Sequence, residues 1–478
     1  MTSGTIKFVW NNKILKIDNP DPNETLLNFI RLKIKKTGTK EGCAEGGCGA
    51  CTVVLAELKK NDLTYKSINA CISFVTILQG KQLILVEDLL NNNGSLHPVQ
   101  KAMVDYHGSQ CGFCTPGFVM SLFAMQKNYS SYTEKNIKDS ISGNLCRCTG
   151  YRPIIDAAKS LKNGSRSDKF VKNKKKIINL LKRIKPININ IKNGNKKYFA
   201  PTTISELKKI IKDYPNSNFL SGGTDLSLIV TKERKDIDNI ISLNSINELN
   251  FIEEKNKHIV VGATTSLRDF ELFIKKYYPD FTAILNRYGS VQIRNVGTIA
   301  GNIATASPIG DTLPLLLSLD AKVVLQSFNK KIILPLNFFF ISYRKTKLKK
   351  RQFIHSIIIP ISKKNIFKAY KISKRIDDDI SSVCASFNLE IKNKTIKNIK
   401  IAYGGMASIP KRAINCEKSL INLNISEINI EKAKKILEKD FKPISDMRAS
   451  KNYRMEIAKN LLTKCFMEIK DNKLLRLN

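Results

Sequence analysis

The sequence Gly42-Cys-Ala-Glu-Gly-Gly-Cys-Gly-Ala-Cys51 places three cysteines in one short segment, and Cys71 adds a fourth. Glycines flank or separate these cysteines. A residue without a Cβ atom lets the backbone turn sharply and point N–H groups at sulfur. Because thiolates are ligands of soft metals, the segment predicts a loop that wraps closely around a metal centre.

The spacing Cys43, Cys48, Cys51 and then Cys71 is typical of plant-type [2Fe–2S] ferredoxins, in which four thiolates serve two irons. A zinc site is the alternative, but zinc sites usually combine two Cys-x2-Cys pairs and this group has only one. Strand-like residues surround the loop at 5–9, 52–58 and 81–86, and 24–33 has helical character. This order predicts a small β-grasp domain.

A second group of cysteines follows as Cys111, Cys114, Cys146 and Cys148. In Gln110-Cys-Gly-Phe-Cys-Thr-Pro-Gly117 the first pair stands at the start of a predicted helix over 118–127. In Gly143-Asn-Leu-Cys-Arg-Cys-Thr-Gly-Tyr-Arg-Pro153 the second pair lies in a turn that enters another helix. Helix N-termini favour thiolates, so this group predicts a second metal centre, although the spacing alone would also suit zinc.

Composition narrows the class of protein. Eight of the 11 cysteines fall in the two groups, which favours metal ligation over disulfides, while Cys384, Cys416 and Cys465 are expected in cores.

The first residues do not resemble a signal peptide and no long apolar run occurs, so we expect a cytoplasmic protein without a membrane partner. The net charge of +39 is spread along the chain, which argues against a nucleic-acid partner.

Both cysteine groups, with their neighbours, resemble the iron–sulfur domains of the xanthine dehydrogenase and aldehyde oxidase family. The resemblance covers Gly38–Val53, Leu96–Gln100, His107–Gly117 and Asn144–Pro153. It implies that the second cluster lies nearest a molybdopterin, with Gln110 and Cys148 beside the pterin. It also implies that the first cluster lies between the second cluster and a flavin.

Two loops rich in small residues follow. Phe219-Leu-Ser-Gly-Gly-Thr-Asp-Leu226 continues a predicted strand after a helix expected at 204–213, and Thr298-Ile-Ala-Gly-Asn302 lies within a similar segment. Small residues let backbone N–H groups approach a phosphate, so the two loops could hold a pyrophosphate. Neither has the Gly-x-Gly-x-x-Gly spacing of a Rossmann unit.

These loops resemble the FAD-binding domain of the para-cresol methylhydroxylase and vanillyl-alcohol oxidase group, to which the flavin domain of the xanthine dehydrogenase family belongs. The resemblance implies that the loops contact the FAD diphosphate and ribityl chain, that Asp311 adds a hydrogen bond, and that the Tyr288 ring lies against the isoalloxazine. The FAD-contacting residues that it implies are Phe219, Leu220, Ser221, Gly222, Gly223, Thr224, Asp225, Leu226, Tyr288, Thr298, Ile299, Ala300, Gly301, Asn302, Asp311, Ile354 and Lys371.

The last part of the chain also carries the resemblance, at Tyr403–Ala407 and Ser445–Arg454. In the charged segment 369–380, the resemblance places Lys371, Arg375 and Asp378 at the edge of the flavin, where NAD would approach.

We therefore predict an α+β multidomain chain. It comprises a β-grasp ferredoxin-like domain at 1–91, a small helical [2Fe–2S] domain at 92–164 and a basic linker at 165–191. A two-part α+β FAD-binding domain follows at 192–362, and a C-terminal α+β flavoprotein domain at 363–478.

The function implied by the resemblance is that of an electron-transfer subunit of the xanthine dehydrogenase type, with no catalytic residue of its own. Electrons would pass from molybdopterin on a separate large subunit, through two [2Fe–2S] clusters, to FAD and then NAD, during oxidation of hypoxanthine or xanthine to urate. We expect a heterotetramer of two small and two large chains. The alternatives are a subunit that serves oxidation of an aldehyde or another N-heterocycle and, more remotely, a basic zinc protein that binds nucleic acid.

Overall fold

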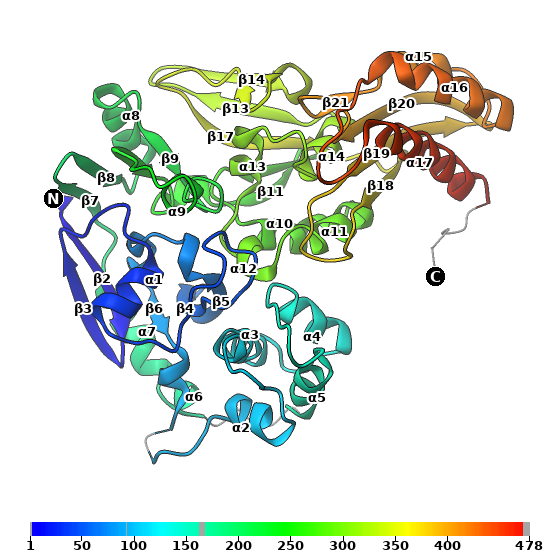
Figure 1. Cartoon of the computed structure of the whole chain (residues 1–478). Coiled ribbons are helices and arrows are strands. Elements are labelled where there is room, and N and C mark those ends of the chain that lie inside the picture. The colour runs from blue at the N-terminus through cyan, green and yellow to red at the C-terminus, as the bar shows by residue number, and fades with distance from the viewer. Residues whose placement is uncertain (1, 92, 162–167, 472–478) are drawn as a thin grey trace. The chain divides into compact units, whose positions relative to one another are not determined.

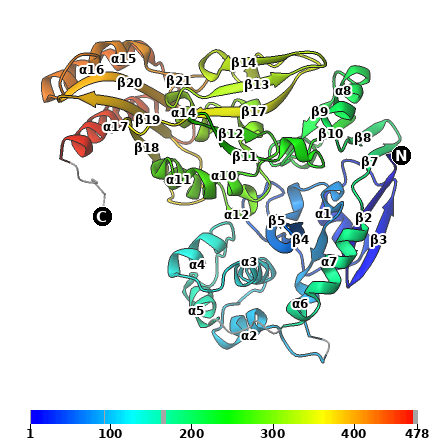
Figure 2. The same ribbon diagram turned by 180° about the vertical axis from the view of Figure 1, so that it is seen from behind.

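The chain divides into two folded units. The computed structural model describes residues 2–91, 93–161 and 168–471. The first unit comprises Met1–Asn247 together with Gly289–Gly297, and the second comprises Glu248–Tyr288 together with Thr298–Asn478. Figure 1 and, from behind, Figure 2 show the elements of both. No helix in the described part of the chain combines the length and apolar character needed to cross a membrane.

A five-stranded sheet begins the first unit, and its strands alternate inward and outward side chains. Ile6 and Phe8 of β2 point into one core, whereas Val9 joins another. The strand order is β3-β2-β6-β4-β5, at Lys13–Asp18, Thr5–Trp10, Gln82–Ile84, Thr52–Lys59 and Asp62–Asn69. The strands predicted around the cysteine loop are thus confirmed. The helix expected at 24–33 is a short turn, α1 (Leu26–Asn28), which continues as a wider π turn, η1 (Phe29–Lys33).

Four helices form the part of the first unit that carries the second cysteine group. They are α2 (Pro98–Asp105), α3 (Thr115–Asn128), α4 (Glu134–Ile141) and α5 (Arg152–Ser160). Helix α3 is buried on nearly all sides because it packs against α2, α4 and the strands β4 and β5. Its sequence is correspondingly apolar all round, as expected of a helix inside a core.

The stretch predicted as a basic linker at 165–191 is mostly helical where the structure describes it, and its last residues belong to strand β7 (Asn188–Asn193). Residues 162–167 lie outside the described residues, but α6 (Lys169–Lys172) and α7 (Lys174–Arg183) follow directly. Ile177, Leu181 and Ile184 recur at helical spacing and are buried in the same core as α3, while the lysines cover the outer face. The abundance of lysine concealed this amphipathic pattern.

A mixed sheet completes the first unit in the order β1-β7-β8-β10-β9. Its strands are Thr2–Ser3, Asn188–Asn193, Lys196–Ala200, Asn239–Ser242 and Asn218–Leu220. Helix α8 (Ile204–Asp213) has the predicted bounds, and Thr203 caps it by accepting a hydrogen bond from the Glu206 N–H. Two further short helices of this unit are α9 (Leu228–Thr231) and α12 (Val291–Arg294).

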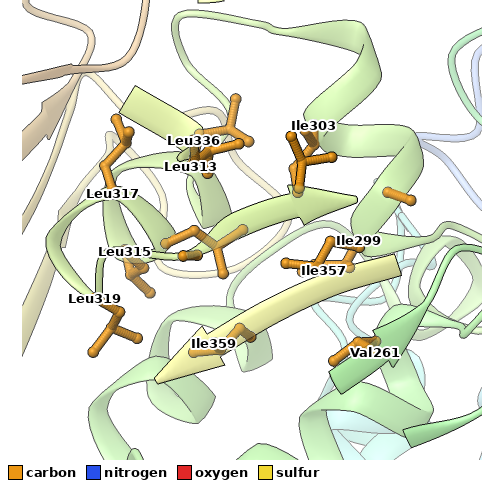
Figure 3. Packing of buried hydrophobic residues seen from close by; sticks show 14 of the residues in the cluster. Val261, Ile299, Ile303, Leu313, Leu315, Leu317, Leu319, Leu336, Ile357 and Ile359 are labelled. Atoms are coloured by element: carbon orange, nitrogen blue, oxygen red, sulfur yellow. The ribbon is translucent and has the colours of Figure 1, made fainter. Parts of the chain in front are cut away.

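The second unit begins with an antiparallel sheet in the order β11-β12-β17-β13-β14. Its strands are Ile252–Lys255, His258–Gly262, Phe353–Pro360, Lys322–Gln326 and Lys331–Pro335. Figure 3 shows its core, in which Leu313, Leu315 and Leu317 of α14 (Thr312–Ser318) and Ile357 and Ile359 of β17 are labelled. The helices are α10 (Leu267–Ile274), α11 (Pro279–Asn286), α13 (Ile299–Thr305) and α14 (Thr312–Ser318), and a small hairpin joins β15 (Phe340–Ser342) to β16 (Lys345–Thr346).

A second sheet of this unit, β18-β19-β20-β21, spans Ile366–Ile372, Val383–Lys392, Thr395–Gly404 and Lys411–Arg412. Its central strand β19 alternates between two surfaces. Phe387 and Leu389 face a core shared with α15 (Ile414–Leu420), α16 (Glu427–Asp440) and α17 (Lys451–Asp471). On the other surface, the Ser386 hydroxyl donates to Pro314 O of α14 at 2.7 Å. Helix α14 thus lies between the two sheets.

Single 3₁₀ turns occur elsewhere. They lie at Ala70–Ile72, Val75–Leu78, Val86–Leu89, Asn247–Leu249 and Leu336–Phe338.

We predict that Leu315→Ala lowers the free energy of unfolding of the second unit by about 2–5 kcal/mol, because it removes a fully buried side chain and leaves a cavity. The matched control is Leu272→Ala on α10, whose side chain is 61% exposed. It should change the free energy by less than about 0.5 kcal/mol. Urea unfolding followed by circular dichroism measures both, and equal midpoints for the two variants would contradict this account of the core.

Candidate cofactor sites

The loop that carries Cys43, Cys48 and Cys51 points backbone N–H groups at its sulfurs. The N–H groups of Glu45 and Gly47 donate to Cys43 Sγ at 3.4 and 3.3 Å. Between them, Gly46 has φ +80°, and a Cβ atom there would lie 2.5 Å from Ile72 Cδ1. The glycine is therefore required both by the turn and by the close packing against the residue after Cys71.

The four thiols of this group lie close enough to share protons. Hydrogen bonds from Cys48 and Cys71 hold the pKa of Cys43 far below its usual value, and a hydrogen bond from Cys71 lowers the pKa of Cys51. Cys48 and Cys71 are the donors in these hydrogen bonds, and their bonds to Cys43 raise their own pKa values. Such a set loses its protons most readily when a metal replaces them.

The second group brings together Cys111 with Cys148 and Cys114 with Cys146. The Cys148 thiol hydrogen-bonds to Cys111, and this bond raises the pKa of Cys148. Burial raises the pKa of Cys146, but hydrogen bonds from the Thr149 hydroxyl and N–H outweigh it and lower that pKa overall. Cys111 and Cys148 are exposed, whereas Cys51 and Cys71 of the first group are buried.

Helix α3 begins directly after Cys114, as predicted, but the helix end alone does not keep this thiol deprotonated. Burial, together with the hydrogen bond to Cys146, raises the pKa of Cys114 to about 12. A metal ion must therefore displace the proton.

Each cysteine group offers four thiols, the number that a [2Fe–2S] cluster takes from protein. Within the described ranges, no three or more His, Cys, Asp or Glu side chains are arranged around one point as a single metal ion would need. Zinc requires four ligands around one ion, whereas a [2Fe–2S] cluster spreads four thiolates over two irons. The N–H groups directed at sulfur, the glycine turn and the four thiols of each group fit the cluster.

Two glycines, Gly49 and Gly117, allow the two cysteine groups to approach each other. A Cβ atom on Gly49 would lie 2.2 Å from Gly143 O, and one on Gly117 would lie 2.2 Å from Gly49 O. Here the Leu145 N–H donates to Cys48 O at 3.0 Å. A direct backbone hydrogen bond thus joins a cysteine of the first group to the neighbour of Cys146.

The first predicted flavin loop, Phe219–Leu226, begins within β9 and ends before α9. Gly223 has φ +75°, and a Cβ atom on Gly222 would lie 2.4 Å from Val296 O and 2.6 Å from Gly297 Cα. The buried Ser221 hydroxyl has no hydrogen-bond partner among the residues that the structure describes. An orphaned hydroxyl beside close-packed glycine backbone fits a loop that binds a polar ligand.

The second predicted loop is ordered by its own side chains. Thr298 caps α13 by accepting a hydrogen bond from the Gly301 N–H at 3.0 Å. The Asn302 side-chain amide donates to the Tyr288 hydroxyl at 2.7 Å and accepts from the Thr312 hydroxyl. Tyr288 and Asn302, both predicted flavin contacts, are therefore neighbours in the second unit.

Asp311 and Lys371, predicted as separate contacts, form a buried ion pair with 2.5 Å between Asp311 Oδ2 and Lys371 Nζ. The Ser381 hydroxyl donates to Asp311 Oδ1 at 2.6 Å. Ile354 lies in the core on β17. Arg287, which the sequence did not single out, donates to Ile376 O and Lys371 O and so holds the charged segment in place.

Four family models match the chain in succession. Residues 8–76 match the 2Fe-2S iron-sulfur cluster binding domain and residues 85–159 match the [2Fe-2S] binding domain. Residues 190–362 match the FAD binding domain in molybdopterin dehydrogenase, and residues 368–469 match the CO dehydrogenase flavoprotein C-terminal domain.

Relatives of known sequence carry the name xanthine dehydrogenase. The enzyme of Emericella nidulans is 33% identical over 91% of this chain, and xanthine dehydrogenase 1 of Arabidopsis thaliana is 30% identical over 87%. The chain spans only 36% of the length of each.

Solved structures share the fold. Carbon monoxide dehydrogenase from Hydrogenophaga pseudoflava has 23% identity, with a TM-score of 0.53 over 55% of this chain and 93% of that one. Quinoline 2-oxidoreductase from Pseudomonas putida 86 has 20% identity, with a TM-score of 0.54 over 58% of this chain and 98% of that one.

The order of the four matched domains and the identity to these relatives lead to one assignment. The chain belongs to the molybdenum hydroxylase family of oxidoreductases and comprises its two [2Fe–2S] domains, its FAD-binding domain and its C-terminal flavoprotein domain.

Proposed function

We propose that this chain carries electrons from a molybdopterin site outside it, through two [2Fe–2S] clusters, to FAD and then to NAD. One observation supports the proposal above all: both cysteine groups lie in the same folded unit, and the Leu145 N–H donates to Cys48 O across them at 3.0 Å. When bound, the clusters take electrons one at a time, and FAD combines two of them for delivery as a hydride.

The cysteines divide into ligands of two clusters. Cys43, Cys48, Cys51 and Cys71 hold the first, and the N–H groups of Glu45 and Gly47 stabilise its thiolate charge. Cys111, Cys114, Cys146 and Cys148 hold the second. Because Cys111 and Cys148 are exposed, this second centre is the one that a molybdopterin domain can approach.

The flavin contacts are proposed for each unit separately. In the first unit, residues Phe219–Leu226 contact the diphosphate, with the unpartnered Ser221 hydroxyl as a donor. In the second unit, Thr298–Asn302 contact FAD and the Tyr288 ring lies against the isoalloxazine, held by Asn302. The Asp311–Lys371 pair lies near the flavin, and Ile354 lies behind it.

The proposed substrate is a purine, hypoxanthine or xanthine, because the sequence relatives are named xanthine dehydrogenase. Oxidation of one C–H bond by water releases two electrons and two protons, and NAD⁺ takes up both electrons with one proton. The proposed partner is a separate molybdopterin-binding large subunit, in an assembly of two small and two large chains. Catalytic groups for the purine belong to that partner.

We predict that anaerobically purified protein contains about four iron atoms and four acid-labile sulfides per chain, as two [2Fe–2S] clusters require. Cys43→Ser and Cys146→Ser should each lose about half of the iron and a different one of two EPR signals of the reduced protein. The matched control, Cys416→Ser, changes a buried cysteine outside both groups and should keep both signals.

Circular dichroism verifies that each cysteine variant is folded. Loss of both EPR signals from a folded Cys43→Ser protein would contradict two separate sites. Colourless wild-type protein that contains zinc would reject the whole proposal in favour of a zinc protein.

A second prediction concerns the electron acceptor. NADH should reduce the bound flavin under anaerobic conditions in a stopped-flow experiment. Arg375→Gln removes an exposed cation from the charged segment and should weaken the apparent affinity for NADH about tenfold, as loss of one charge-assisted hydrogen bond of about 1.5 kcal/mol implies. Arg351→Gln, another exposed arginine of the same unit, is the control. If NADH leaves the flavin oxidised, oxygen or a protein acceptor replaces NAD.

A third prediction concerns the substrate and the partner. The chain purified from its native cell should be accompanied by a larger molybdenum-containing polypeptide, and the assembly should reduce NAD with xanthine or hypoxanthine. Activity on quinoline or an aldehyde, with none on purines, would move the assignment to another molybdenum hydroxylase. An immunoblot that finds this sequence within one much longer polypeptide would contradict the separate subunit.

A further inference from the structure

The segment Gly289–Gly297 folds with the iron–sulfur domains, although the chain on both sides of it belongs to the second unit. The segment begins directly after Tyr288 and ends directly before Thr298, and both of these residues belong to the second unit. Its single helical turn, α12, is capped by Ser290, whose hydroxyl accepts a hydrogen bond from the Ile293 N–H at 3.3 Å. Flavin-domain sequence is therefore part of the structure that holds the cysteines.

Gln292, on α12, is fully buried in a cluster of polar side chains. Its amide nitrogen lies 3.1 Å from both Ser121 Oγ and Asn144 Oδ1, and 3.4 Å from Thr52 Oγ1. The partners are also joined to one another. The Ser121 hydroxyl donates to Asn144 Oδ1 at 2.6 Å, and the Asn144 amide donates to Thr52 Oγ1 at 3.3 Å.

Each partner of Gln292 belongs to a segment that carries cysteines. Thr52 follows Cys51, and Ser121 lies on α3, which begins after Cys114. Asn144 stands two residues before Cys146 and also donates to Gly49 O, inside the first loop, at 3.1 Å. The three cysteine-bearing segments are thus joined by side-chain hydrogen bonds at Asn144, and the Gln292 amide adds a contact to each of them from a fourth segment.

The surroundings of Gln292 leave it little freedom. A Cβ atom on Gly143 would lie 2.5 Å from Gln292 Oε1 and 2.2 Å from Ser290 Cβ. Buried polar groups that are linked in this way hold one arrangement, because breaking one bond leaves other polar atoms without partners in a dry interior. A substitution that removes the amide donor should therefore change how the two cysteine loops are placed.

We propose that Gln292 is a positioning residue that fixes the separation and orientation of the two iron–sulfur centres, and with them the rate of electron transfer between them. This inference rests on the proposed function, namely that the eight cysteines hold two clusters. Electron tunnelling falls steeply with distance, so a small displacement of either loop changes the rate.

The test uses the assembled, cluster-loaded protein with Gln292→Met, which keeps the length of the side chain but removes its N–H donors. The matched control is Asn295→Leu on the same segment. Asn295 is also buried, but its amide donates to Ser67 O and Ser67 Oγ on β5 instead of bridging the two cysteine groups. The two measurements are the magnetic interaction between the reduced clusters by EPR and the intercluster transfer rate after a rapid one-electron pulse.

We expect Gln292→Met to keep full iron content and both EPR signals, with an altered magnetic interaction and an intercluster transfer rate several-fold slower than that of the wild type, because tunnelling falls steeply with distance. Asn295→Leu should retain the wild-type interaction and rate. If Gln292→Met does not fold, Ser121→Ala removes one partner of the amide and should show a smaller change of the same kind.

An unchanged interaction and rate in a folded Gln292→Met protein, or equal changes in Asn295→Leu, would overturn the proposal. Wild-type protein without iron would instead refute the proposed function, so the two failures are distinguishable.

Discussion

The main chain at Gly49 packs directly against the main chain at Gly143 and at Gly117, with no side chain between them. The placement of both cysteine groups depends on this contact. One of these glycines lies in the first cysteine loop, one on α3 and one just before the second cysteine pair. A methyl group at any of them would collide with main-chain atoms or with a neighbouring Cβ atom, which are harder to displace than the end of a flexible side chain. The backbone bond from Leu145 to Cys48 exists only because this approach is possible.

The iron–sulfur domains could be predicted from the sequence alone, because the spacing of cysteines and glycines that identifies them lies within short stretches of the chain. A cysteine loop needs glycine at particular positions to turn around a cluster, and residues 42–51 contain both three predicted ligands and the glycines that let the loop turn. Helix α8 was equally visible, because Thr203 marks its start and its apolar residues recur at helical spacing. The assignment of individual flavin contacts remains a prediction, since it came from resemblance.

Other features could not be predicted because they join residues far apart in the chain. Asp311 and Lys371 were each expected to contact a cofactor. They form a buried ion pair with each other, which no local sequence pattern predicts. The same holds for Gln292, whose partners lie at 52, 121 and 144. The helices α6 and α7 were missed for a different reason: Ile177, Leu181 and Ile184 did carry a helical period, but lysine is so abundant throughout the chain that the segment resembled a solvated run.

The return of Gly289–Gly297 to the first unit has a consequence for how the protein is made. A nascent chain that has emerged only as far as Asn247 lacks the turn that contacts Thr52, Ser121 and Asn144, so these polar groups lack the Gln292 amide at that stage of translation. The first unit is therefore complete only after residues 289–297 have been synthesised. These residues follow residues 248–288, which belong to the second unit. The folded unit that carries both cysteine groups is therefore completed only by sequence that belongs to the flavin domain.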